Sequence, residues 1–245
     1  MTWAIEHHDG IARLAFHRPP QNYADFASII ELGNLLEAAV QCDDVKVVML
    51  TGSGDGFFIN HAEPADLAKA GAGSATQDEL DSWARALRLL EEIPQPTIAA
   101  IDGLAAGGGN ELALACTLRV GSERVRLQQP EVGVGIITGG GGSVRLPRLV
   151  GPGIAAEVVL TGRAFAATEA LRAGWLNAVL PTVDFTEHAL RWAAVIAAGP
   201  APALRAAKRS IVLGSREPFA DALALESDLF SQLTASSDAL KEAIT

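Results

Sequence analysis

Residues 97–147 read TIAAIDGLAAGGGNELALACTLRVGSERVRLQQPEVGVGIITGGGGSVRLP. The stretch opens with an apolar run, 97–101, that predicts a buried strand. Two glycine-rich segments follow, and a glutamate accompanies each of them: Glu111 the first and Glu131 the second. Glycine allows backbone conformations and close approaches that other residues do not. Two acids beside such backbone are unusual in so apolar a sequence.

The glycines at 107–109 come directly before an apolar helix predicted over Glu111–Cys116. The first N–H groups of a helix have no partner within it, and together with the helix dipole they stabilise negative charge. An oxyanion that forms during a reaction would be stabilised in the same way, and Glu111 would be placed for proton transfer. The alternative is a tight strand-to-helix connection followed by a surface glutamate that compensates the dipole.

Composition narrows the class of protein. The chain has 245 residues, 49% of them hydrophobic, and its mean hydropathy is +0.23, which is enough for one large domain or two small ones. A net charge of −10 and a sequence pI near 4.9 argue against a nucleic-acid partner, which would need a basic face. A ligand that carries phosphates would have to meet locally placed Arg and Lys side chains.

Compartment and metal content are also constrained. The two cysteines, Cys42 and Cys116, form no CxxC pair or His/Cys cluster, so we expect free thiols and no metal site. The N-terminal MTWAIEHHDG lacks the regions of a signal peptide, and no apolar run reaches membrane-spanning length. The sequence therefore predicts a cytoplasmic protein that has no membrane partner.

Periodicity predicts the order of the elements. A strand pair (2–8 and 11–17) turns at Asp9-Gly10, and the next expected elements alternate between helix and strand. They are a helix at 24–41, a strand at 45–51, a helix from about Pro64, a flexible loop at 70–76, a helix at 77–93, strands at 123–128 and 176–179, and a helix from 139–142 to Leu149. The last part of the chain is expected to be helical, at about 186–198, 202–213 and 219–235.

Two glycine-rich segments invite a nucleotide-binding interpretation. TGSGDG (51–56) does not have GxGxxG spacing, and Phe57-Phe58-Ile59 follows it in place of a helix, so a polar loop is the better interpretation. GVGIITG (133–139) lacks both the preceding strand and the acidic ribose partner. Nucleotide binding is therefore a weak alternative.

The central segments IDGLAAGGGNELALAC and QQPEVGVGIITGGGGSVRLPRLVG resemble the enoyl-CoA hydratase/isomerase (crotonase) family. Other segments resemble the family in the same order, so the resemblance covers nearly the whole chain; they are LAFHRPPQNYADF, VVMLTGSGDGFFINHAEPADL, LTGRAFAATEALRAGWLNAVLP and APALRAAKRSI. The resemblance implies an α/β fold, a crotonase-like spiral of repeated ββα units over 1–185, followed by a C-terminal helical trimerisation region over 186–245. It also implies a homotrimer, or a hexamer built as a dimer of trimers.

The same resemblance implies a reaction: reversible addition of water to the 2,3-double bond of an acyl-CoA thioester, as in the β-oxidation of fatty acids. Coenzyme A is then part of the substrate, and no other cofactor and no metal is implied. Glu131 would handle the proton at C2, Glu111 would help to hold and activate the water, and the N–H groups of Ala62 and Gly108 would form the oxyanion hole. A carboxyl in a partly apolar pocket can stay protonated near neutral pH, so acid and base roles can coexist.

Further residues are implied for substrate binding: Arg18, Asn60, His61, Glu63, Ala65, Gly107 and Gly139. His61 departs from the family's commonest pattern, which has a glycine there, and Gln21 stands where a lysine is usual. His61 is either a wall of the pocket, a surface residue or a third catalytic group. The chain also ends at Thr245, without the basic tail of many relatives, which bears on CoA contacts and subunit packing.

Alternative functions stay open. The presence of both Glu111 and Glu131 favours a hydratase, because the related isomerases commonly keep one of the two acids. An enoyl-CoA delta isomerase, another crotonase-type acyl-CoA enzyme and a non-catalytic acyl-CoA-binding member of the family are the alternatives. Acyl chain length and stereochemistry do not follow from these residues.

Overall fold

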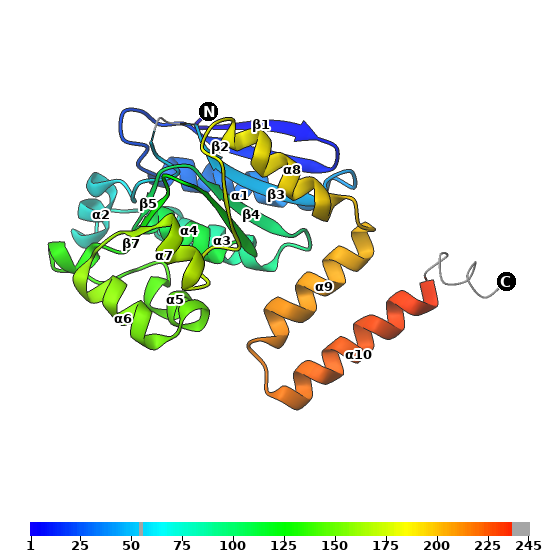
Figure 1. Cartoon of the computed structure of the whole chain (residues 1–245). Helices are drawn as coiled ribbons and strands as arrows, with labels where there is room; N and C mark the ends of the chain where they lie inside the picture. The colour runs from blue at the N-terminus through cyan, green and yellow to red at the C-terminus, as the bar shows by residue number, and fades with distance from the viewer. Residues whose placement is uncertain (54–55, 237–245) are drawn as a thin grey trace.

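The computed structural model of the chain describes residues 1–53 and 56–236 (Figure 1). Its main sheet has the strand order β1-β2-β3-β4-β6-β9. β1 and β2 are antiparallel, and every later neighbour pair is parallel. The bounds are β1 (Trp3–His8), β2 (Ile11–Phe16), β3 (Val47–Gly52), β4 (Thr97–Ile101), β6 (Leu118–Ser122) and β9 (Ala178–Leu180).

A second, smaller sheet has the order β5-β7-β8, with bounds β5 (Leu104–Ala106), β7 (Arg126–Gln128) and β8 (Phe165–Ala166). Successive turns of the chain add one strand to each sheet and then a helix: β4 and β5 precede α4 (Gly108–Ala115), and β6 and β7 precede α5 (Gly142–Val150). The predicted α/β spiral of ββα units is therefore present. The spiral brings the starts of α4 and α5 into contact, where the N–H of Gly142 donates to the side chain of Glu111.

Helices cover both faces of the main sheet (Figure 1). The larger core cluster joins one face to α1 (Phe26–Val40), α3 (Gln77–Glu92) and α4. On the opposite face α8 (Phe185–Ala197) packs its buried side chains against strand residues such as Val47 and Ile98. β3 and β4 are buried along their whole length except at Gly52, which explains their continuous apolar runs.

Local signals account for where these helices start. Asp25 accepts a hydrogen bond from the N–H of Ser28 and caps α1. Thr76 and Glu79 form a capping box at the start of α3, which ends the loop that precedes it. The predicted helices at 24–41 and 77–93 are confirmed within one or two residues.

The strand predicted at 123–128 is wrong in extent. The structure has two strands here, β6 and β7, separated by a turn at 123–124, and the sequence reading missed β6. The charge of Arg119, the second residue of β6, hides the strand signal. Its side chain is 6% exposed, and its guanidinium donates to the carbonyls of Trp175 and Cys116, which satisfies the buried cation.

Other boundaries also differ from the sequence prediction; the strand expected at 176–179, for example, is β9 at Ala178–Leu180. α2 (Pro64–Gly71) extends into the loop expected at 70–76. α4 begins at Gly108, so the glycine run lies inside the helix start rather than before it. α5 begins at Gly142, and 139–141 form a bend that the hydrogen bonds of the site require. η1 (Glu131–Val134), α6 (Pro152–Thr161) and α7 (Ala167–Arg172) complete this part of the chain.

The C-terminal helices α9 (Ala201–Gly214) and α10 (Phe219–Ser236) form a hairpin that projects from the core (Figure 1). The predicted domain boundary at 185/186 coincides with the start of α8, which packs on the sheet, so only α9 and α10 stand apart. The predicted trimerisation role of this region stays a prediction. The tail 237–245, and part of the 51–56 loop, lie outside the described residues.

Candidate active site

Both glutamates line one cavity of about 540 Å³, between the start of α4, α3 and the loop before α5. Apolar side chains make up much of its wall: Phe26, Leu67, Leu80, Trp83, Leu87 and Ile137. A cavity of about 580 Å³ between the end of α3 and the α9–α10 hairpin includes neither glutamate. A concave apolar site with two convergent acids is typical of an enzyme's substrate pocket.

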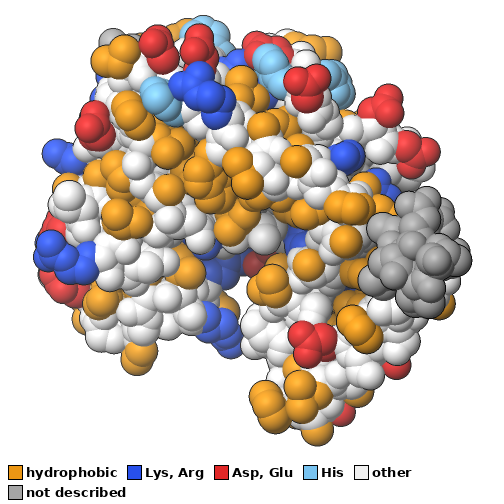
Figure 2. Space-filling view, turned by 45° about the vertical axis from the view of Figure 1, so that its right-hand side comes forward, with side chains coloured by type: hydrophobic (Ala, Val, Ile, Leu, Met, Phe, Trp, Pro, Cys, Tyr) orange, Lys and Arg blue, Asp and Glu red, His pale blue; other side chains and the backbone are white. Residues whose placement is uncertain are grey.

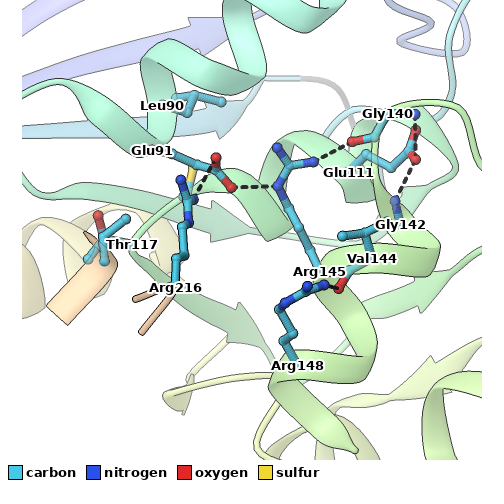
Figure 3. Close-up of polar contacts among 12 residues, drawn as sticks. Leu90, Glu91, Glu111, Thr117, Gly140, Gly142, Val144, Arg145, Arg148 and Arg216 are labelled. Atoms are coloured by element: carbon cyan, nitrogen blue, oxygen red, sulfur yellow. Dashed lines mark hydrogen bonds and ion pairs between the residues drawn. The ribbon is translucent and has the colours of Figure 1, made fainter. Parts of the chain in front are cut away.

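Glu111 lies in the first turn of α4 and is 4% exposed. Its Oε1 accepts two hydrogen bonds from the loop before α5, from the N–H of Gly140 at 2.7 Å and from the N–H of Gly142 at 2.8 Å (Figure 3). Burial raises the pKa of the Glu111 carboxyl above its usual range, while the hydrogen bonds from Gly142 and Gly140 oppose that shift. The carboxyl is therefore held in position by the backbone of a distant segment.

Glu131 begins η1, directly after Pro130, and is half-buried. Burial raises the pKa of its carboxyl to about 7, and the charge of Glu111 acts in the same direction. Its Oε2 is buried and has no hydrogen-bond partner in the described residues. A carboxyl that is half protonated near neutral pH and has a free oxygen suits a group that gives and takes a proton.

The two predicted oxyanion donors lie next to each other. A Cβ placed on Gly108 would come within 3.2 Å of the backbone nitrogen of Ala62. Ala62 forms an isolated parallel bridge with Ala24, in which the hydrogen bonds are made by its neighbours His61 and Glu63. The Ala62 N–H is thus left to face away from Ala24. Gly108 is the first residue of α4, where helical N–H groups lack partners. Both donors line the cavity.

His61 also lines this cavity, beside Gly107 and Glu131. Gly107 has φ +50°, and a Cβ there would collide with His61 Nδ1 and lie 3.2 Å from Glu131 Oε1. Glycine is therefore required at 107 for both conformation and space. Burial lowers the pKa of the His61 imidazole, so the neutral ring is favoured at pH 7.

The other predicted binding residues divide into two groups. Gly139 lines the cavity, whereas Arg18, Asn60, Glu63 and Ala65 are not among its lining residues. Arg18 is held by Glu63 at 2.6 Å and by Asp25 at 3.1 Å, so its charge is compensated within the chain. Asn60 is buried in backbone contacts, and Ala65 is exposed on α2. Their roles in binding stay predictions.

Sequence reasoning missed a pair of buried amides. The side chains of Asn110 and Gln129 are fully buried and meet at 2.9 Å. Asn110 precedes Glu111, and Gln129 lies two residues before Glu131, so this contact ties the two acid-bearing segments together. The signal was present, because each amide lies within two residues of a catalytic candidate.

Comparison with known proteins agrees with this geometry. The chain matches the enoyl-CoA hydratase/isomerase family over residues 6–245. It is 33% identical over 242 residues to the crotonyl-CoA hydratase of Syntrophomonas wolfei, which covers 98% of this chain and 92% of that protein. It is 35% identical over 227 residues to the 2,3-dehydroadipyl-CoA hydratase of Escherichia coli, covering 92% of this chain and 87% of that protein.

Among solved structures, the enoyl-CoA hydratase of Bacillus anthracis superposes with a TM-score of 0.90 at 31% identity, covering 99% of this chain and 95% of that one. The chain therefore belongs to the enoyl-CoA hydratase/isomerase family, and its predicted fold is confirmed. Enzymes of this family act on acyl-CoA substrates. None of the helices in the described residues is both long enough and apolar enough to cross a membrane.

Proposed function

We propose that this protein is an enoyl-CoA hydratase, which adds water reversibly across the 2,3-double bond of an acyl-CoA thioester. The observation that carries the proposal is the pair Glu111 and Glu131 on one apolar cavity, beside the adjacent N–H groups of Ala62 and Gly108. The relatives named as hydratases, at 33% and 35% identity, support the same reaction.

In this proposal each group has one part in the reaction. The thioester oxygen would accept hydrogen bonds from the Ala62 and Gly108 N–H groups, which stabilise the negative charge of the enolate. Glu111 takes a proton from water as the water oxygen bonds to C3, and the Glu131 carboxyl gives its proton to C2. The two acids together hold one proton before and after the reaction, so no net proton is consumed. The active form of the enzyme is therefore the pair with a single proton.

The test is steady-state hydration of a short 2-enoyl-CoA, followed as loss of the ultraviolet absorbance of the conjugated thioester. Glu111→Ala and Glu131→Ala would be measured beside the wild type. Activity that collapses in both variants supports the mechanism. Activity that survives both substitutions would contradict it.

The isomerase is the second candidate, because the family includes both activities. A 3-enoyl-CoA substrate distinguishes it: an isomerase would generate the conjugated thioester and its absorbance would rise. If the wild type does neither but still binds the thioester, it is an acyl-CoA-binding protein or acts on another acyl group. We expect assembly as a trimer or hexamer, as the resemblance implies, and sedimentation would test that expectation.

A further inference from the structure

The position of Glu111 depends on a loop that has no side chains of its own. Both hydrogen bonds to Glu111 Oε1 come from the glycine run 139–142. Glycine loses more conformational freedom on ordering than any other residue, so four in succession do not define a loop by themselves. A group outside the run must hold its shape.

Arg145, in the first turn of α5, is one such group, together with Thr138, whose Oγ1 accepts from the N–H of Ser143 at 2.9 Å. The Nη1 of Arg145 donates to the carbonyl oxygen of Gly140 at 2.5 Å (Figure 3). Gly141 has φ +92°, and a Cβ on it would collide with the same Nη1. The guanidinium therefore packs on the loop at Gly141 and binds Gly140, the residue whose N–H holds Glu111.

Arg145 is in turn held by an ion pair with Glu91. Its Nε lies 2.6 Å from Oε1 of Glu91, near the end of α3, and the other oxygen of Glu91 lies 2.7 Å from Arg216 (Figure 3). Arg216 belongs to the connection between α9 and α10. Glu91 is well shielded, with a side chain 15% exposed. Burial would raise its pKa, but the hydrogen bonds and charges of Arg145 and Arg216 outweigh burial and lower it.

Figure 2 shows a hollow between the core and the C-terminal helices, with Lys and Arg side chains inside it. A small cavity is lined by Glu91, Arg145, Arg148 and Arg216 together with residues of α4 and α9. Arg145 also lines the cavity that holds Glu111. The path Arg216–Glu91–Arg145–Gly140–Glu111 thus runs from the hairpin to the catalytic candidate through contacts of 2.5–2.7 Å.

We propose that Arg145 is a positioning residue for Glu111, and that Glu91 and Arg216 connect this position to the C-terminal hairpin. The proposal rests on the proposed function for its kinetic readouts only. Arg145 fixes the loop that places the Glu111 carboxylate against the attacking water. Its positive charge also favours the ionised form of Glu111.

The kinetic experiment compares Arg145→Met and Arg145→Lys with Arg148→Met as the matched control. Arg148 is an exposed cation on the same helix, and its guanidinium donates to the carbonyl of Val144 rather than to the glycine run. Arg145→Met should lower kcat by about 10- to 100-fold, since a misplacement of about 1 Å can cost that much, and should change KM far less. Arg148→Met should leave kcat near the wild-type value.

The pH profile separates charge from position. Without the positive charge of Arg145 the pKa of Glu111 rises, so the acidic limb of the kcat profile should move to higher pH in Arg145→Met. Lys keeps the charge but cannot bind the Glu91 carboxylate and the Gly140 carbonyl at the same time as the guanidinium does. Arg145→Lys should therefore keep the wild-type acidic limb while kcat is still reduced. Glu91→Gln and Arg216→Met should lower kcat in the same direction by smaller factors.

A second measurement does not depend on the reaction. Hydrogen–deuterium exchange of a peptide that spans residues 139–144 should be faster in Arg145→Met and Glu91→Gln than in the wild type, and unchanged in Arg148→Met. If the wild type lacks hydratase activity, the proposed function fails but this exchange still decides whether Arg145 holds the loop. If Arg145→Met does not fold, Arg145→Lys and Glu91→Gln carry the test.

Wild-type exchange together with wild-type kcat and pH profile in these variants would overturn the proposal. A rise in KM with unchanged kcat would overturn it as well, since Arg145 would then bind substrate rather than position Glu111. If kcat of Arg145→Met falls by the same factor at every pH, with no shift of the acidic limb, the proposed effect of the Arg145 charge on the pKa of Glu111 is contradicted.

Discussion

Glu111 and Glu131 line the same cavity, yet the segments that carry them differ in nearly every physical respect. Glu111 is buried in the first turn of a helix and accepts two backbone hydrogen bonds on one oxygen. Glu131 is half-buried, and its Oε2 has no hydrogen-bond partner within the described part of the chain. It precedes an exposed segment in which Val134 is 77% and Ile137 73% exposed. Two residues of one type therefore obtain different properties from their surroundings.

The comparison teaches how a pair of carboxyls divides one proton. Burial raises the pKa of both groups. Two backbone hydrogen bonds oppose the shift at Glu111, whereas at Glu131 one backbone hydrogen bond opposes it and the nearby charge of Glu111 adds to it. The proton of the singly protonated pair is therefore favoured on Glu131, with a pKa of about 7. This is the state in which Glu131 can act as the acid and Glu111 as the base.

The largest expected effect is the loss of either carboxyl. Glu111→Gln and Glu131→Gln keep the shape but remove proton transfer, and each should reduce kcat for enoyl-CoA hydration by about 10²–10⁴. Steady-state absorbance assays check this, with Glu187→Gln as a control, because Glu187 is exposed on α8 and forms an ion pair with Arg191 on the same helix. A loss of less than tenfold in one variant would break the proposed division of roles.

A pH profile sharpens the comparison. The enzyme needs one proton on the pair, so kcat/KM for hydration should fall by about tenfold per pH unit above the pKa of Glu131, near pH 7. Dehydration of the 3-hydroxyacyl-CoA should show the same pH dependence, because the overall reaction consumes no proton. In Glu131→Gln the limb near pH 7 should disappear from the residual activity. A limb that persists there would belong to another group.

The amide pair between the two segments should matter for stability. Asn110→Ala removes the side chain that meets the buried Gln129 amide at 2.9 Å, which should cost about 1–3 kcal/mol in the free energy of unfolding. Denaturant unfolding of both single variants and the double variant measures the coupling between them. Purely additive losses would show that the contact does not tie the segments together.

The smallest expected effect is at His61. Burial lowers the pKa of its imidazole, and no hydrogen bond from the ring to either glutamate is present in the described residues. His61→Ala should therefore change kcat by less than about tenfold, below the effect of general acid–base groups. Its kcat and pH profile would be compared with the wild type. A loss as large as that of Glu131→Gln would make His61 a third catalytic group.

The sequence predicted most elements because their signals are local. Apolar runs identified β3 and β4, and the capping residues Asp25 and Thr76 mark where α1 and α3 begin. β6 was missed because an arginine in a short apolar run looks like a surface charge. In the structure the Arg119 guanidinium is buried and donates to the carbonyls of Cys116, which is near in sequence, and Trp175, which is distant. A buried cation satisfied by tertiary contacts leaves no local pattern.

The sequence by itself determined which reactive groups are present, namely two glutamates beside glycine backbone, and that its segments match one family in order. Only the tertiary structure decided how the two acids differ, because burial and hydrogen bonds from distant segments set their pKa values. It also decided that Arg18 is paired within the chain and that Arg145 and Glu91 meet across 54 positions. Periodicity reports which face of an element is buried, whereas these contacts depend on how the spiral brings separate turns together.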